Sequence, residues 1–225
     1  MKIYIFVIYI LFTSCLSVPK QYNILAPGVW RATLILNENR QVNVTRNIDK
    51  VVTRDTRPES TQTVIPFNFN VIYKTDSTFY IELINGHEKI KMDSIVFGRD
   101  IKTGNDTMVI YLTPYDAVLK CIYENNKMSG EFIVKDKINY SIPFTASYGQ
   151  EYRFEKLPVK SNLNINGNWE TTFAPDSSDQ FNAIGEFKQE GNNLSGTFRT
   201  ETGDFRFLSG EISGNIINLS AFDGA

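Results

Sequence analysis

Few residues in this chain have the type and spacing needed for covalent or redox chemistry. The 225 residues include two cysteines, Cys15 and Cys121, and one histidine, His87. The sequence has no Gly-x-Ser-x-Gly nucleophile motif, no phosphate loop, no His-Glu-x-x-His motif, no dinucleotide fingerprint and no Cys-x-x-Cys pair. A Cys-His or Ser-His arrangement would have to use His87, while Ser-Lys and paired-carboxylate chemistries remain open without a marker. We therefore predict no catalytic residue, no cofactor and no metal in the chain.

The remaining candidate side chains have structural explanations. His87 lies just past Asn85-Gly86, so a solvated turn histidine is favoured over a metal ligand. Six acids in the last third could supply a carboxylate pair, but they fall on predicted turns and outward positions. These acids are Asp176, Asp179, Glu186, Glu190, Glu201 and Asp204. The phenylalanines fall on strand-alternating positions, which favours a hydrophobic core over a ligand cage.

The N-terminus carries the most specific signal. Lys2 is followed by the apolar run IYIFVIYILF and then by Thr13, Ser14 and Cys15. A run of about ten apolar residues is too short to span a bilayer, which needs roughly twenty, so residues 1–14 are predicted to be a signal peptide. The sequence LFTSC resembles a bacterial lipobox, which implies cleavage before Cys15 and diacylation of its thiol. An ordinary signal peptide with an incidental cysteine is the alternative.

This N-terminus predicts that the protein is located in the bacterial cell envelope. Residues 15–27, which contain Pro19 and Pro27, are expected to form a lipidated tether. No acidic run follows Cys15, so a periplasm-facing, lipid-anchored membrane protein is expected. The net charge of −2, with basic and acidic residues interspersed, offers no basic stripe and argues against nucleic-acid binding. The expected partners are the membrane and, as an open alternative, an envelope protein; the oligomeric state is left open.

Cys121 is expected to be a buried, unreactive thiol. If Cys15 carries lipid, Cys121 is the one thiol left, and one thiol cannot form an internal disulfide. In VLKCIYE the alternation places Leu119, Cys121 and Tyr123 on one face and Lys120 and Glu124 on the other. Reactive cysteines occupy exposed electropositive sites, so the core-facing position favours a structural role.

Short alternating segments separated by turn residues predict an all-β fold. Residues 28–148 are expected to form a first antiparallel β-meander module, in which Asn85-Gly86 marks a hairpin. Residues 149–166 are expected to be a linker with one short strand, and residues 167–225 a second β-meander module. Each module is expected to be sandwich-like or barrel-like. The strand from Ile216 to Phe222 is followed by a turn signal alone, so the second module is expected to be incomplete.

The two modules share a short internal sequence repeat. Asn126-Lys127-Met128-Ser129-Gly130-Glu131-Phe132 resembles Asn192-Asn193-Leu194-Ser195-Gly196-Thr197-Phe198, and Gly28-Val29-Trp30 resembles Gly167-Asn168-Trp169. Two copies of one antiparallel unit explain the match, although hairpin chemistry alone is an alternative. Gly130 and Gly196 take core-facing positions between large apolar residues, which predicts a coil or a close approach of backbones there.

Three strings resemble a known family. They are IVFGRDIKTGNDTMVIYLTPYDAVLKCIYENNKMSGEF, INYSIPFTASYGQEYRF and the stretch from Gly167 to Ala225. They are similar to the N-terminal β-rich region of TlpA-like thiol-disulfide oxidoreductase lipoproteins of Bacteroidota. In that family a thioredoxin-like domain with a Cys-x-x-Cys motif follows the β region. This sequence holds no such domain, so the resemblance carries over no catalytic residue.

Two functions of different classes follow. The first is a non-catalytic N-terminal region of an envelope lipoprotein, which serves anchoring, spacing or partner binding for a missing redox domain. The second is a free-standing lipoprotein whose β modules bind an apolar or glycan ligand in a barrel mouth. The second predicts a closed fold with a cavity lined by Phe and Tyr, whereas the first tolerates a filled core and an open sheet edge near Ile216 to Phe222.

Overall fold

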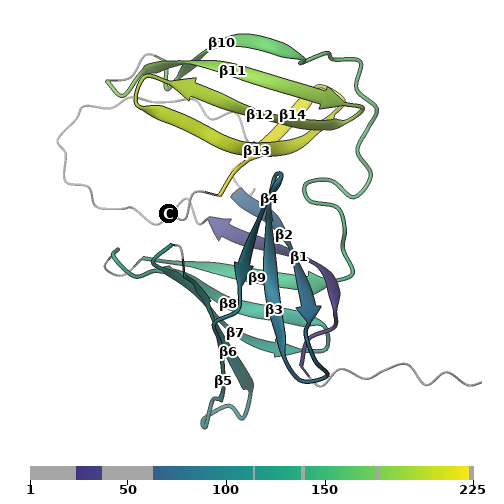
Figure 1. Ribbon diagram of the computed structural model, residues 1–225, viewed down its shortest axis with the longest axis vertical. Coiled ribbons are helices and arrows are strands. Elements are labelled where there is room, and N and C mark those ends of the chain that lie inside the picture. The colour runs from purple at the N-terminus through teal and green to yellow at the C-terminus, as the bar shows by residue number, and fades with distance from the viewer. Residues whose placement is uncertain (1–23, 37–62, 114, 138–139, 176–177, 223–225) are drawn as a thin grey trace, which may run out of the picture.

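A computed structural model describes residues 24–36, 63–113, 115–137, 140–175 and 178–222. Within these residues the chain forms fourteen strands and no helix, arranged as two antiparallel sheets of nine and five strands (Figure 1). The predicted fold class, all-β with two antiparallel sheets, is confirmed. Each sheet curls on itself like a half-barrel, as expected from the right-handed twist that strands accumulate.

Sheet A contains the first nine strands, in the order β4-β3-β2-β1-β9-β8-β7-β6-β5. Their bounds are β1 Gly28–Leu36, β2 Thr63–Tyr73, β3 Phe79–Asn85, β4 Glu88–Met92, β5 Ile95–Arg99, β6 Asp106–Leu112, β7 Ala117–Glu124, β8 Lys127–Val134 and β9 Ser141–Tyr148. β1 pairs with both β2 and β9, so every consecutive pair is bonded except β4 and β5. Sheet A is therefore an up-and-down meander that opens along one seam.

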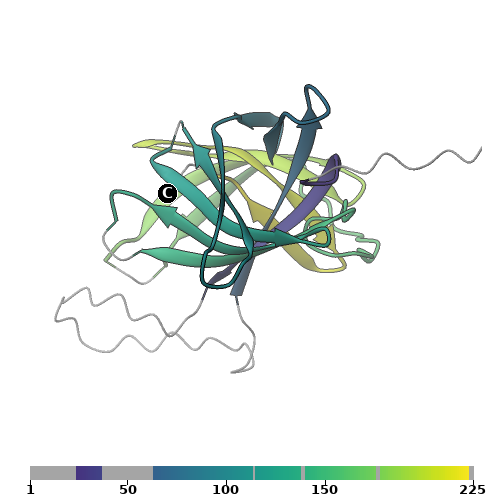
Figure 2. The same ribbon diagram turned by 90° about the horizontal axis from the view of Figure 1, so that it is seen from below.

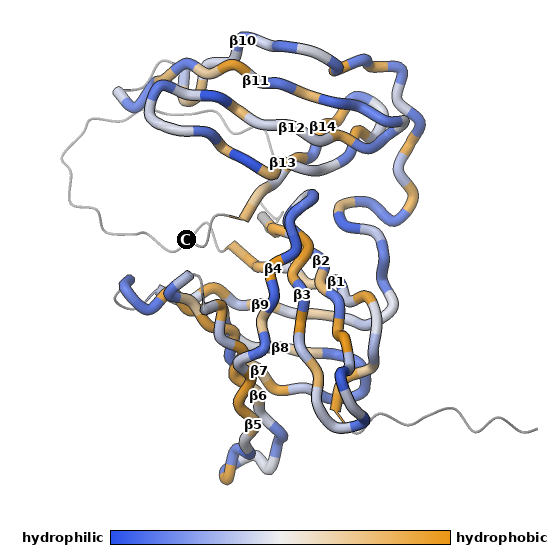
Figure 3. The backbone as a smooth tube through the Cα atoms, viewed as in Figure 1, coloured by the Kyte–Doolittle hydropathy of each residue, from blue (hydrophilic) through white to orange (hydrophobic). Residues whose placement is uncertain are grey.

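The interior of sheet A follows from alternation along its strands. In β3, Phe79, Ile81, Leu83 and Asn85 are buried and the residues between them are not. Figure 3 shows the same alternation of hydrophobic and hydrophilic residues along other strands of this sheet. Side chains from both halves of the curl meet in one hydrophobic core.

Trp30 anchors this core at the start of β1. Its ring is fully buried and stacks on Phe69 with ring centroids 5.9 Å apart. Its indole N–H donates to the carbonyl oxygen of Ala26 at 2.9 Å, and the Tyr73 hydroxyl donates to Leu25 at 2.8 Å. Leu25 itself is buried in the core. Residues 24–27, just before β1, were expected to be part of the tether. They pack against the core of sheet A instead, because their side chains and carbonyl oxygens complete the packing around Trp30.

Sheet B is a five-stranded meander in the order β10-β11-β12-β13-β14. Its strands are β10 Gly167–Phe173, β11 Phe181–Glu190, β12 Asn193–Thr200, β13 Gly203–Ser213 and β14 Ile216–Ser220. Aromatic rings cluster on one of its faces: Phe173 stacks on Phe181 at 4.7 Å and meets Phe198 edge-on at 4.9 Å. The linker between the sheets contains no strand in the structure, so the short strand predicted there is wrong; its backbone bonds to side chains instead.

The short internal sequence repeat corresponds to repeated local structure. Gly28 and Gly167 both take positive φ values, 110° and 105°, and each indole that follows, Trp30 or Trp169, donates to the carbonyl four residues earlier at 2.9 Å. Gly130 pairs with Cys121 just as Gly196 pairs with Phe187. The strand neighbours differ, however, because β1 lies between β2 and β9 while β10 is an edge strand bonded to β11.

The predicted close approach of backbones at the two repeated glycines, Gly130 and Gly196, is confirmed. A Cβ added at Gly130 would overlap the carbonyl oxygen of Lys120, and one added at Gly196 would overlap the carbonyl oxygen of Glu186. A side chain at either position would push a strand pair apart, so glycine permits the tight coiling of both hairpins.

We predict that Gly130→Ala lowers the free energy of unfolding by about 3 kcal/mol, since the new methyl group meets unyielding backbone. Chemical denaturation followed by circular dichroism measures the change. Ser129→Ala is the control, because Ser129 is an exposed neighbour on the same strand and should change stability by less than about 0.5 kcal/mol. Equal effects of the two substitutions would contradict the close approach.

Candidate functional site

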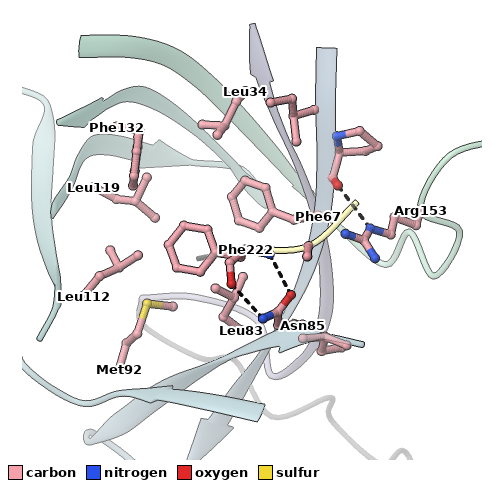
Figure 4. A pocket seen from close by; sticks show the side chains of 14 residues that line it. Leu34, Phe67, Leu83, Asn85, Met92, Leu112, Leu119, Phe132, Arg153 and Phe222 are labelled. Atoms are coloured by element: carbon pink, nitrogen blue, oxygen red, sulfur yellow. Dashed lines mark hydrogen bonds between the residues drawn. The ribbon is translucent and has the colours of Figure 1, made fainter. Parts of the chain in front are cut away.

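The end of sheet A that faces sheet B is an apolar mouth. Figure 4 shows apolar side chains around it, among them Leu34, Leu83, Met92, Leu112, Leu119 and Phe132. They come from β1, β3, β4, β6, β7 and β8, so the mouth exists because the sheet curls. A cavity of about 50 Å³ remains in it, far below the 300 Å³ or more of a typical small-molecule site.

Asn85 lies at the rim of this mouth, in a position that differs from the sequence prediction. We predicted Asn85-Gly86 to be the hairpin turn, but Asn85 pairs with Glu88 and the two-residue loop is Gly86-His87. Gly86 alone of the loop takes a positive φ, 60°, which is the geometry of a turn with glycine first. The one-residue shift makes Asn85 a strand residue. Its side chain therefore points inward and is 1% exposed.

Asn85 binds the backbone of Phe222 from the far end of the chain. Its Nδ2 donates to the Phe222 carbonyl oxygen at 2.9 Å, and its Oδ1 accepts the Phe222 N–H at 2.8 Å (Figure 4). The second hydrogen of Nδ2 reaches the Glu88 carboxylate at 3.1 Å. This buried amide is well satisfied, as burial of a polar group requires.

The Phe222 ring enters the mouth of sheet A. It meets Tyr115 edge-on at 4.9 Å and Phe132 at 6.4 Å between ring centroids. We predicted the last strand to run through Phe222, but β14 ends at Ser220. Ala221 and Phe222 leave sheet B there, because burying the ring in sheet A and binding Asn85 replace the ladder contacts that a longer β14 would make.

Arg153, in the linker, holds the other side of the same junction. Its Nε donates to the Pro66 carbonyl oxygen at 3.2 Å, its Nη1 to the Ser209 hydroxyl at 2.6 Å, and its Nη2 to the Ser220 hydroxyl. Burial lowers the pKa of this guanidinium to about 10, so it stays cationic at neutral pH. The described acceptors are uncharged oxygens from both sheets, which makes Arg153 a structural cross-link.

The two sheets meet at a third point, the tip of the β3–β4 hairpin. The backbone of Gly86 approaches β13 so closely that an added Cβ would lie 2.7 Å from the carbonyl oxygen of Phe207. Phe207 has a positive φ of 58°, a conformation rare for a phenylalanine. Figure 1 shows sheet B above sheet A, and in Figure 2, seen from below, the two sheets overlap.

A polar cleft of about 470 Å³ opens beside this tip, between the linker and sheet B. His87 lies here and is exposed, as predicted for a solvated turn residue. Lys188 and Glu190, also at the cleft, form an exposed ion pair of 2.6 Å. In the part of the chain that the structure describes, no three His, Cys, Asp or Glu side chains gather at metal-binding distance.

The predicted acids of sheet B that the structure describes are ion-paired or exposed. Glu186 bonds to Arg199 at 2.9 Å, Glu190 pairs with Lys188, and Asp179, Glu201 and Asp204 are exposed. Asp176 lies outside the described residues.

Cys121 is core-facing, as its alternation predicted. It is 5% exposed and its thiol lies 3.6 Å from the Met108 carbonyl oxygen. Burial raises the pKa of the Cys121 thiol to about 12, so almost no thiolate forms at neutral pH. Cys15, the predicted lipidation site, lies outside the described residues.

No protein-family model, curated protein or solved structure matches this chain. The resemblance to TlpA-like lipoproteins therefore stays a prediction. Among the described residues there is also no helix of the length and hydrophobicity that would cross a membrane.

Sequence reasoning missed the site's main residues, Asn85, Arg153 and Phe222. Asn85 was assigned to the turn, Phe222 to a strand, and Arg153 was not singled out. A signal for Asn85 was present in the alternation along β3. Every second residue from Phe79 faces inward, and Asn85 falls in this series. Nothing local marks the other two.

We predict that Asn85→Ala lowers the free energy of unfolding by about 2 kcal/mol, because the Phe222 N–H and carbonyl lose their partners inside the mouth. Thermal and urea unfolding measure the loss. His87→Ala, two residues away and exposed, is the matched control and should stay within about 0.5 kcal/mol of the parent. A stability loss no larger than that of His87→Ala would show that the contact contributes nothing.

We also predict that Cys121 in a Cys15→Ser chain reacts with a disulfide reagent at pH 8 at least a hundredfold more slowly when folded than in urea. With a pKa of about 12, about one thiol in 10⁴ is ionised at that pH, and burial hinders the reagent further. The release of chromophore over time measures both rates. Comparable folded and unfolded rates would contradict the burial of this thiol.

Proposed function

We propose that this chain is a non-catalytic, lipid-anchored β scaffold of the bacterial cell envelope, which faces the periplasm and holds a binding module away from the membrane. It would be the N-terminal region of a TlpA-like lipoprotein, and it would serve anchoring, spacing or partner binding for a redox domain that this sequence does not contain. The lipobox-like LFTSC at Cys15 supports the anchor.

The observation that carries this proposal is the arrangement of the two sheets relative to the N-terminus. In Figure 1 the described chain enters sheet A at the end farther from sheet B, and sheet B covers the opposite end. Arg153, Asn85 and the Gly86 tip join the sheets through hydrogen bonds and close contact. An anchor at Cys15 would therefore keep sheet B on the side away from the membrane.

The chemistry of the described side chains also supports a non-catalytic role. The one buried thiol has a strongly raised pKa, and the buried guanidinium is occupied by neutral acceptors from both sheets. Thiol-disulfide exchange needs an accessible thiolate, so Cys121 could not take over redox work from a missing Cys-x-x-Cys.

The second candidate, ligand binding by a free-standing lipoprotein, is favoured by the mouth of sheet A. This mouth is apolar, is lined by the polar side chains of Asn85 and Arg153, and holds the Phe222 ring, whose removal would enlarge the cavity of about 50 Å³. Its lining is mainly aliphatic, with Phe67, Phe132 and Phe222, and so differs from the Phe- and Tyr-lined cavity that we expected. Ligand sites commonly combine apolar walls with a few placed polar groups.

We predict that the full chain, expressed in a bacterium with a lipoprotein pathway, partitions into the detergent phase and incorporates a labelled fatty acid. Cys15→Ala should abolish both, since the two acyl chains on this thiol supply the stable membrane affinity. Cys121→Ala is the control and should keep the label. An unlabelled parent chain, or a Cys15→Ala chain that remains labelled, would contradict the anchor at Cys15.

A further inference from the structure

The segment that closes the mouth of sheet A is held in the way that proteins hold peptides. Asn85 both donates to the carbonyl and accepts from the N–H of the same residue, Phe222. This pair of bonds recognises an extended backbone and excludes proline, which has no N–H. The ring then fills an apolar space, so the side chain at this position must be large and apolar. Backbone pairing and a side-chain pocket are the two parts of extended-peptide recognition.

We infer that the mouth of sheet A is a binding site for an extended peptide segment with a large apolar side chain, phenylalanine first, and that Ala221–Phe222 occupies it in cis. This inference rests on the second candidate function, ligand binding in the mouth, and is independent of lipid at Cys15. The occupant seated in the site defines the ligand class. The groups that read it, Asn85 and the core around Phe132, belong to sheet A and not to the strand that delivers the segment.

The cis segment has few attachments. β14 ends at Ser220, so Ala221 and Phe222 lie outside the ladder of sheet B. The backbone hydrogen bonds described for Phe222 both go to Asn85, and its ring contacts are with Tyr115 and Phe132. Release of the segment would therefore break the two hydrogen bonds to Asn85, the two ring contacts and the packing of the ring against the core, while the strand pairing of both sheets stays intact.

The mouth has room that Phe222 does not use. The remaining cavity of about 50 Å³ is walled by the same aliphatic side chains that surround the ring. A tethered segment competes at an effective concentration in the millimolar range, so a peptide in trans must overcome that advantage. A segment that fills the cavity better, or a weakened cis segment, shifts the competition toward the peptide.

The test uses the full chain with Phe222→Ala and a fluorescent peptide of residues 216–222, Ile-Ile-Asn-Leu-Ser-Ala-Phe, amidated at its end. Loss of the ring weakens the cis segment, so fluorescence anisotropy should show the peptide binding this variant at least tenfold more tightly than the parent chain. Adding Asn85→Ala should reduce that affinity about tenfold, because two hydrogen bonds to the peptide backbone are lost. A peptide with Ala in place of its Phe is the matched control and should bind at least tenfold more weakly.

Three results would overturn the inference. They are no binding to a Phe222→Ala chain that melts cooperatively, binding insensitive to Asn85→Ala, and binding equal for the Phe and Ala peptides. If the Phe222→Ala chain does not fold, the parent chain is titrated with the peptide while hydrogen exchange of the Phe222 amide is followed. Exchange should speed up as the cis segment is displaced, and unchanged exchange at millimolar peptide would overturn the inference.

A second probe separates this inference from ligand binding in general. The Phe222→Ala chain is titrated with an environment-sensitive anilinonaphthalene dye, which binds apolar cavities without reading a backbone. Dye uptake without peptide binding would overturn the peptide inference and leave ligand binding in the mouth standing. If neither the dye nor the peptide binds, both the peptide inference and ligand binding in the mouth are overturned. Neither result bears on the proposed lipid anchor at Cys15.

Discussion

The fold depends on closing the open end of a curled apolar sheet without leaving polar groups unpaired. Sheet A buries its side chains well along its length, but a curl has ends, and at the upper end the core would meet water. Phe222 supplies an apolar ring there, and Asn85 pairs with the backbone that delivers it. Arg153 completes the closure by donating to Pro66 in sheet A and to two serines in sheet B.

The two sheets differ in how much of their apolar surface they bury. Sheet A surrounds its core with nine strands, whereas five strands leave the aromatic face of sheet B partly uncovered, with Trp169 and Phe205 each 45% exposed. Both sheets share a glycine that allows two backbones to touch, Gly130 in one and Gly196 in the other. The shared unit thus sets local coiling, while the number and order of neighbouring strands decides how much core is enclosed.

The proposed anchor and the proposed peptide site would use different parts of the molecule. A lipid at Cys15 would act at the N-terminal end of sheet A, and the mouth lies at the end covered by sheet B. A peptide in trans would reach this site only when the cis segment at Phe222 is released. The junction of the sheets would then carry both roles, since it holds sheet B in place and presents the occupant of the mouth.

Much of this protein was determined by its sequence alone, because the relevant signals are local. Alternation and turn residues predicted the all-β antiparallel fold, the close approach at Gly130 and Gly196, and the burial of Cys121, since a strand's two faces and a hairpin's register depend on residues a few positions apart. The tertiary structure alone decided the functional site. Asn85 and Phe222 are 137 residues apart, and Arg153 bonds to residues 87 and 67 positions away. Such pairs leave no periodic trace in the sequence, and a shift of one residue at the Gly86-His87 loop was enough to turn a predicted turn asparagine into the buried group that closes the fold.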